Sequence, residues 1–423
     1  MADAKVESQP LEIKTTGLSW VIAILVSCSY MVSFITRFTW ATAIPVAAPD
    51  LGINMAAAGG LMTAYFGGYV VGNFITGFAV DRFGPKLTLT CATGLTGLFT
   101  VLIPFAPNYW LIFALRVCAG FVSGPLFSCV TKYQISWFAR NVRTIAMGVM
   151  MAGAAVGTSI ASAVFAPIIR NVGWRTGFTY GAICCFIVAA LTFFICKEQG
   201  PAAQRAVVAK NATPEEKAAQ RAGLKEVVLR KSFLFGTIAC FLSIAQNTGF
   251  NTYIVRYFTL VRGFDLVTAG LIVGSTQMVG LFSGTLAGIV ADLVIKSKKR
   301  TALIGTILSI ACFFGILFAT NTAFLIFVMV VRLVVAAWFG TPLNGLQSQA
   351  AAGPFSGRAM GLYNGIAQCG STISPIIFGM ILDMTGDNYS IIFITIMCML
   401  AVNGTLVQLM EERKVEPPKP AAT

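Results

Sequence analysis

The sequence predicts an all-α membrane protein with twelve transmembrane helices in two pseudo-symmetric six-helix bundles. Three observations support this fold. Of the 423 residues, 57% are hydrophobic and only 11% are charged. Apolar runs long enough to cross a bilayer recur along the whole chain, and short motifs of the first half return in the second. This composition excludes an ordinary soluble domain. The net charge is +14, but apolar runs separate the basic residues instead of leaving them gathered on one exposed face. Nucleic acid is therefore not the expected partner.

Each predicted span is an apolar run between polar interruptions. About 20 apolar residues cross about 30 Å of hydrocarbon. Because a bilayer offers no partner for open backbone groups, the runs are predicted to be helices, and they lack the alternation of barrel strands. The predicted spans are 18–47, 56–80, 87–105, 109–138, 144–168, 173–196, 233–261, 267–295, 301–319, 323–350, 359–382 and 389–409.

The longest polar stretch divides the chain into two bundles. We expect a cytoplasmic tail over 1–17, a first bundle over 18–196, a cytoplasmic linker over 197–232, a second bundle over 233–410 and a cytoplasmic tail over 411–423. The linker and alternate connections carry most of the Lys and Arg. The positive-inside rule therefore predicts a multi-pass protein of the cytoplasmic (inner) membrane with both termini in the cytoplasm.

Three short matches relate the two halves. The run from Gly77 to Asp81 is echoed by 288–292, Ala-Met-Gly opens both span five and span eleven, and Leu-Ile-Phe precedes both Arg116 and Arg332. The three pairs have nearly the same offset. Two similar halves predict a site at their interface near the middle of the membrane, exposed alternately to each side.

Three arginines fall inside predicted spans. A centrally placed Arg costs about 2.5 to 3.5 kcal/mol. At 1.5 Å per residue, Arg37, Arg116 and Arg332 lie roughly 15, 10 and 14 Å from the outer ends of their spans. No Asp or Glu lies at comparable depth, so an anionic substrate is the predicted partner. The alternative is structural: Arg116 can bond helix-end carbonyl groups, and Arg332 can face similar groups.

Polar residues at helical spacing are further candidates for the lining of this site. Such groups can fix a small polar anion, but polar residues also join membrane helices to each other, and that alternative stays open. The candidates for substrate contact, besides the three arginines, are Tyr65, Tyr69, Asn247, Asn251, Gln277, Tyr363 and Asn364, and Gln368 supplies a further hydrogen-bonding group on span eleven.

The chain lacks the usual residues of catalysis and metal binding. It contains no His, and its eleven Cys include no C-x-x-C pair. We therefore expect no metal, no cofactor and no enzymatic activity.

Several motifs resemble the major facilitator superfamily. Gly77-Phe-Ala-Val-Asp81-Arg82-Phe-Gly84-Pro-Lys86 resembles its G-x-x-x-D-R-x-G-R-K loop between spans two and three. The runs 116–120 and 173–175 resemble its span-four R-x-x-x-G and its Gly-Trp-Arg before span six. The resemblance implies a gating role at the inner end for Gly77, Asp81, Arg82, Gly84, Lys86 and Asp292, although Arg82 and Lys86 also satisfy the positive-inside rule alone.

Span one is similar to that of the anion:cation symporter branch, which contains hexuronate and galactonate carriers. The shared residues are Arg37 and, eight positions later, Pro45, with Ala43 between them. That branch usually has an Asp directly before the span-one Arg and a Glu seven residues after the span-four Arg. Here those positions are Thr36 and Ser123, so the family's proton-carrying acids are missing.

The predicted function is secondary active transport of a small organic anion, a mono- or dicarboxylate, by alternating access. The resemblance favours proton symport, with the proton travelling on the substrate or through water. Anion exchange, facilitated diffusion by the same fold, and drug or amphiphile export are the alternatives. The expected partners are the anion, a co-transported proton and the lipid bilayer. A monomer is expected because each chain contains a whole pathway.

Overall fold

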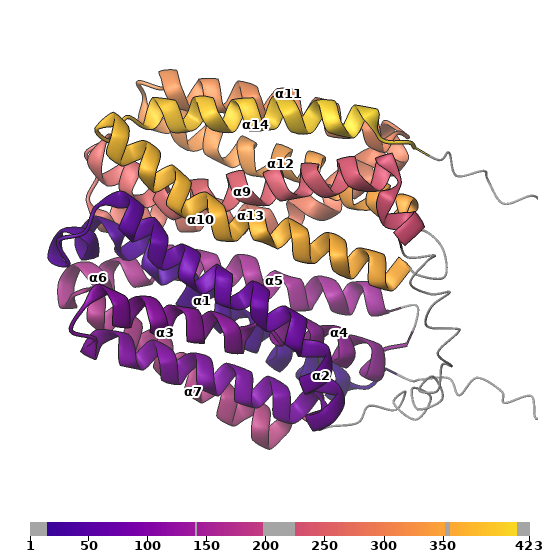
Figure 1. Ribbon diagram of the computed structural model, residues 1–423, viewed down its shortest axis with the longest axis horizontal. Coiled ribbons are helices and arrows are strands. Elements are labelled where there is room, and N and C mark those ends of the chain that lie inside the picture. Colours follow the sequence, from indigo (N-terminus) through magenta and orange to yellow (C-terminus); the bar gives the residue numbers. More distant parts are fainter. Residues whose placement is uncertain (1–14, 140–141, 198–224, 352–355, 413–423) are drawn as a thin grey trace, which may run out of the picture.

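The computed structural model describes residues 15–139, 142–197, 225–351 and 356–412. In these ranges every regular element is a helix, and the long helices lie roughly along one common axis (Figure 1). The first half contains α1 (Gly17–Asp50), α2 (Met55–Leu102), the 3-10 turn η1 (Ile103–Phe105), α3 (Tyr109–Ser123), α4 (Leu126–Trp137), α5 (Arg143–Ala163), α6 (Phe165–Val172) and α7 (Trp174–Ile195).

The second half repeats this plan. It contains α9 (Lys231–Leu260), α10 (Leu266–Ile289), the π-helical turn η3 (Val290–Val294), α11 (Lys298–Phe318), α12 (Thr322–Ala350), α13 (Ser356–Thr385) and α14 (Tyr389–Leu409).

The predicted spans coincide with these helices. Within the described residues, eleven helical stretches are long and apolar enough to cross a membrane. The remaining predicted span, 56–80, is the first part of α2. Large apolar side chains such as Phe194 and Met384 are 80% and 85% exposed, as expected for a surface that faces lipid. The twelve-helix prediction is confirmed.

Spans two and three are two helices, here labelled together as α2, that meet at a sharp break without an intervening loop. The kink lies at Gly84, whose φ of 79° is costly for residues with a Cβ, and Pro85 follows it. Two other predicted spans are interrupted as well. Gly124 and Pro125 separate α3 from α4, and Val164 separates α5 from α6.

The two halves form two groups of helices that meet along α2, α5, α10 and α13 (Figure 1). We call the end where α1 stops and α2 begins the far end, on the left in Figure 1. The opposite end, where α7 stops and α9 begins, is the linker end. The helix α2 packs on α13, and α5 packs on α10.

A group of cross-half hydrogen bonds, which we call the far-end clasp, joins α2 to α9 and α13. The backbone N–H groups of Met55 and Ala56 donate to Asp383 Oδ1 and Oδ2 at 2.8 and 2.7 Å. The Tyr253 hydroxyl lies 2.9 Å from the Met55 carbonyl oxygen and 2.8 Å from that of Pro375. A carboxylate at a helix N-terminus satisfies backbone donors that otherwise lack partners.

Close backbone approach makes the clasp possible. A Cβ on Gly59 would lie 2.2 Å from the Pro375 carbonyl oxygen, and one on Gly379 would lie 2.2 Å from that of Met55. Only glycine fits at these two crossings of α2 and α13. The Ser159 hydroxyl adds a 2.7 Å bond to the Gly274 carbonyl between α5 and α10. These contacts fasten the two halves to each other at the far end.

Candidate functional site

A central cavity of about 270 Å³ lies between the two halves. Its walls come from α1, α2 and α5 of the first half and from α9, α10, α12 and α13 of the second. The lining residues are Phe34, Arg37, Phe38, Phe66, Ala154, Ala155, Thr158, Ile244, Asn247, Thr248, Asn251, Gln277, Leu333, Gln368 and Ser371. Within this described lining, Arg37 is the only charged residue.

The Arg37 side chain is held in an aromatic cage. Its guanidinium carbon lies 4.5 Å from the ring centre of Phe34, 4.6 Å from Tyr69, 5.1 Å from Phe66 and 5.2 Å from Tyr65. Aromatic faces attract a cation but accept no strong hydrogen bond from it. Arg37 is 4% exposed, and its buried Nε and Nη2 atoms have no acceptor. The cage fixes the cation and leaves donors for an anion.

The two predicted tyrosines contact Arg37 and are absent from the described lining of the central cavity. Tyr65 and Tyr69 are 1% and 5% exposed, and both present their rings to the guanidinium. The Tyr65 hydroxyl pairs with Ser33 Oγ at 3.4 Å. Direct contact of these tyrosines with a substrate stays a prediction.

Three predicted amides form a chain on the opposite wall. Gln277 Nε2 donates to Asn251 Oδ1 at 2.9 Å, and Asn251 Nδ2 donates to Asn247 Oδ1 at 2.6 Å. All three residues line the central cavity. The chain does not use the two N–H donors of Asn247, which can therefore bind a hydroxyl or an acid group in the cavity.

Arg116 is bonded to the protein backbone, as the structural alternative for this residue requires. It is 1% exposed, and its Nε donates to the Leu61 carbonyl at 3.1 Å. Its Nη1 and Nη2 donate to the carbonyls of Thr36 and Arg37, both at 3.4 Å. Arg116 is absent from the described cavity lining. Its hydrogen bonds join α1, α2 and α3. Contact of Arg116 with the substrate stays a prediction, and this geometry gives it no support.

Arg332 is also buried, but it lies in a different cavity. Its guanidinium carbon lies 4.2 Å from the ring centre of Phe250 and 5.7 Å from that of Phe313, and its buried Nε has no acceptor. This second cavity, also about 270 Å³, lies within the second half. Asn247 and Leu333 line both cavities. Arg37 and Arg332 thus line two adjoining cavities, and Arg116 is absent from the described lining of both.

The two remaining predicted wall residues do not reach the central cavity. The Tyr363 hydroxyl donates to Asn344 Oδ1 at 2.8 Å, and Asn364 is exposed. One and two turns further along α13, Gln368 and Ser371 do line the cavity. The sequence had named Gln368 as a hydrogen-bonding group of this span, and residues four and seven positions after Asn364 lie on the same face of a helix. The sequence therefore indicated the right helix face but not which of its turns lines the cavity.

The hydroxyls at the positions where the resembled branch has acids bond within their own helices. Thr36 Oγ1 donates to the Ser33 carbonyl at 3.1 Å, and Ser123 Oγ donates to the Gly120 carbonyl at 2.7 Å. Neither can ionise at neutral pH, so neither supplies a counter-charge to Arg37 or Arg116.

The predicted gating residues lie at the linker end. Lys86 Nζ lies 5.2 Å from the ring centre of Phe193, and Arg82 is exposed with its guanidinium carbon 5.8 Å from the Phe83 ring centre. Asp292 pairs with Lys298 of its own half at 3.1 Å. The side chains of Gly77 and Asp81 lie outside the described residues. A gating role for this set stays a prediction.

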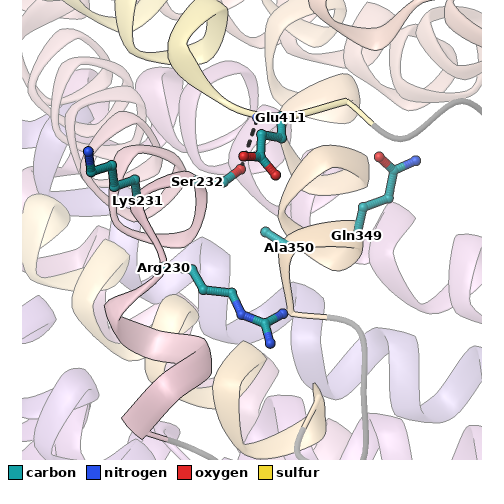
Figure 2. A pocket seen from close by; sticks show the side chains of 6 residues that line it. All are labelled: Arg230, Lys231, Ser232, Gln349, Ala350 and Glu411. Carbon is teal, nitrogen blue, oxygen red and sulfur yellow. Dashed lines mark hydrogen bonds between the residues drawn. The ribbon is translucent and has the colours of Figure 1, made fainter.

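A further polar pocket of about 240 Å³ opens at the linker end, where α9 begins and α12 and α14 end (Figure 2). The Glu411 backbone N–H donates to Ser232 Oγ at 3.2 Å. Its six lining residues all belong to the second half or its approach, so the pocket does not lie between the halves. They are Arg230, Lys231, Ser232, Gln349, Ala350 and Glu411.

Comparison with known proteins gives consistent results. The family model described as Major Facilitator Superfamily matches residues 26–351 and 286–423. A probable sulfoacetate transporter of Cupriavidus necator is 24% identical over 90% of both chains. A probable galactarate/D-glucarate transporter of Bacillus subtilis is 23% identical over 90% of both chains. A hexuronate transporter of Bacillus subtilis is 25% identical over 84% of this chain and 86% of its own.

Solved structures share the fold. A bacterial homologue of the human lysosomal transporter Spinster, in an inward-facing and unoccupied conformation, has a TM-score of 0.72 at 14% identity. The similarity covers 93% of this chain and 95% of that one. A D-xylose–proton symporter has a TM-score of 0.73 at 16% identity, over 92% of this chain and 98% of its own. At such identities the likeness concerns the fold alone.

Proposed function

The chain belongs to the Major Facilitator Superfamily, and from this premise we propose that it carries a small organic anion across the cytoplasmic membrane by alternating access. Its relatives are named transporters, which supports a transport protein rather than an enzyme. Sulfoacetate, galactarate, D-glucarate and hexuronate are all organic acids, and they set the substrate class that we propose.

The observation that carries the proposal is the state of Arg37. It is the only charged residue in the described lining of the cavity between the halves, and two of its nitrogen atoms lack an acceptor. A buried unpaired charge costs several kcal/mol, and an anion in hydrogen-bonding contact offsets that cost. The lining of the cavity therefore favours an anion over a cationic drug or an uncharged solute.

Binding of an acid group to Arg37 also suggests how the substrate drives the conformational change. The far-end clasp already joins the halves at one end, so the opposite transition requires the linker end to close over the cavity. Closing an empty cavity would remove the remaining solvent beside a guanidinium that is already 4% exposed and has no counter-ion in the described cavity lining. A bound acid group removes this penalty, so the loaded carrier closes more readily than the empty one.

For the coupling we propose proton symport, as in the resembled branch, with the proton carried on the substrate or through water. Anion exchange is the second candidate, and one observation favours it. No acid lies among the described residues that line the cavity, and the chain has no His, so the lining contains no proton-accepting side chain. We further propose that the linker end is cytoplasmic, because it carries the basic connections, and that a monomer is the working unit.

The test is uptake of labelled glucarate and glucuronate into liposomes that contain the purified protein. We expect Arg37→Gln to lower uptake of both acids by about tenfold or more, because the anion loses its charged partner. Arg300→Gln removes an exposed arginine at the linker end and serves as the matched control with unchanged uptake. Unchanged uptake by a folded Arg37→Gln variant would contradict the proposed site.

The same vesicles separate the coupling modes. An inward proton gradient accelerates uptake by a symporter, whereas an exchanger needs an anion inside and ignores the gradient. Efflux of a cationic dye in place of acid uptake would identify an exporter and overturn the anion assignment.

A further inference from the structure

The cavity around Arg332 has the features of a binding site. Arg332 is 7% exposed, and no carboxylate is found among the described residues that line this cavity. Besides Arg332 Nε, two other buried polar atoms of the lining lack partners, Ser309 Oγ and Gln246 Oε1. Buried polar groups in folded proteins are normally satisfied, so three unsatisfied groups around one space indicate a polar occupant.

The Arg332 cavity resembles the Arg37 cage in its construction. In each, one guanidinium rests against aromatic rings that accept no strong hydrogen bond, Phe250 and Phe313 in the case of Arg332. In each, at least one guanidinium nitrogen is buried without an acceptor. Both cationic sites are therefore suited to the same kind of partner, a compact acid group.

The two cavities are neighbours rather than separate sites. Asn247 and Leu333 line both of them, so the two spaces meet at these side chains. Asn247 ends the amide chain that begins at Gln277. Leu333 directly follows Arg332, and its side chain lies 3.4 Å from the position of a Cβ on Gly280. A polar amide and an apolar divider thus stand between the two arginines.

We propose that Arg332 forms a second anion subsite and that the preferred substrate is an organic dianion with an acid group at each end of a short hydroxylated chain. One acid group binds Arg37, the other binds Arg332, and the amides between them bind the hydroxyls. This inference rests on the proposed function, because it extends the site anchored by Arg37. A monoacid neutralises one guanidinium and leaves the other buried charge without a counter-ion, which makes it the weaker ligand.

The experiment compares two acids that share one carbon skeleton, glucuronate with a single carboxylate and glucarate with one at each end. Binding is measured by calorimetry, and KM is measured by liposome uptake, on the full chain. We expect the wild type to bind glucarate about tenfold more tightly than glucuronate. Arg332→Gln should weaken glucarate binding by about tenfold and leave glucuronate binding nearly unchanged, so that the preference disappears.

Two further variants make the outcome specific. Arg332→Lys keeps the charge and should restore part of the preference for glucarate. Ser309→Ala removes one unsatisfied hydroxyl with little change in shape and should weaken glucarate binding alone, by less than Arg332→Gln. Arg300→Gln is the matched control. Thermal unfolding of each variant without ligand confirms that the protein is folded.

Different results overturn different claims. Equal weakening of both acids by Arg332→Gln would make Arg332 a general or structural residue and overturn the dianion proposal. No effect on either acid would also overturn it. In both cases the carrier function stands as long as Arg37→Gln removes uptake of both acids. Loss of the carrier function itself would show as unchanged uptake in Arg37→Gln.

Discussion

Arg116 and Arg332 occupy matching places in the two halves, yet their surroundings differ. Both follow a Leu-Ile-Phe run and both are nearly inaccessible, at 1% and 7% exposure. Arg116 donates to three backbone carbonyls, whereas no described residue accepts a hydrogen bond from Arg332 Nε. Matching positions in the two repeats therefore place both arginines in buried surroundings but do not give them the same partners.

Glycine explains the difference around Arg116. A Cβ on Gly120 would lie 1.9 Å from the Tyr65 carbonyl oxygen, and one on Gly68 would lie 2.1 Å from that of Val117. These glycines let α2 and α3 approach closely, which brings the Leu61 carbonyl within reach of Arg116. Around Arg332 the neighbours are the bulky rings of Phe250 and Phe313. One arginine joins helices, and the other lines a cavity.

The largest expected effect separates these two roles by stability. Arg116→Gln leaves up to three buried carbonyls with fewer partners, at a cost of about 1 kcal/mol or more each. We expect it to lower the free energy of unfolding by about 3 kcal/mol. Arg332→Gln removes an unpaired buried charge and should be neutral or stabilising without ligand. The measurement is thermal unfolding in detergent, in which the amount of monodisperse protein that remains is determined at each temperature.

Equal loss of thermal stability in the two variants would contradict the different roles of Arg116 and Arg332. An Arg332→Gln protein as unstable as Arg116→Gln would mean that Arg332 is also structural. In that case the unpaired charge of Arg332 would no longer support a ligand site in the second cavity.

The sequence predicted the helices well because span length, apolar content and the absence of partners in lipid constrain the backbone strongly. It did not predict which arginine is satisfied, since this depends on how closely neighbouring helices approach. Arg37 was placed at the cavity, but the aromatic cage that holds it comes from three-dimensional packing of α1 on α2.

The far-end clasp was missed for a related reason. Asp383 falls directly after the predicted span 359–382, where it resembles any polar residue at a membrane surface. Its role appears only when the start of α2, from the other half, lies against it. Tyr253 gave no signal either, because a tyrosine in an apolar run is usually part of the packing. The far-end clasp depends on contacts between segments that are far apart in the sequence.

If the two halves move as units, weakening the far-end clasp should let them separate at that end. Asp383→Asn removes the negative charge and one of two acceptors for the N–H groups of Met55 and Ala56. Hydrogen bonds to charged groups contribute about 1.5 to 3 kcal/mol, so opening of the far end should become about thirtyfold more frequent. Hydrogen exchange of the peptide that contains these two amides measures this directly.

Asp50→Asn is the matched control at the same end. Asp50 accepts hydrogen bonds from Trp174 Nε1 and Arg175 Nη1 at 2.8 and 2.6 Å, all within the first half. It should leave exchange at Met55 and Ala56 unchanged. Equal acceleration by both variants would show general loosening of the far end rather than separation of two units.

The smallest effect is expected at the exposed ion pair between Arg170 and Asp265, which join the two halves at 2.9 Å. The Thr268 hydroxyl, then backbone N–H groups and Arg170, hold the pKa of Asp265 below its ordinary value of 3.8. The charged form therefore persists at neutral pH. The contribution of a carboxylate with a lowered pKa is complete above its ordinary pKa and disappears as the pH falls through the lowered one. The contribution of this pair to far-end exchange should consequently be the same at every pH between about 6 and 8.

Asp265→Asn should accelerate far-end exchange much less than Asp383→Asn, because an exposed pair gains little from attraction in water. Salt distinguishes the two bonds further. At about 1 M salt the screening length falls to about 3 Å, so the effect of Asp265→Asn should vanish while that of Asp383→Asn persists. A salt-sensitive Asp383→Asn effect would mean that long-range charge, rather than hydrogen bonds to the start of α2, holds the halves together. The two halves would then be joined by their surfaces instead of by the clasp.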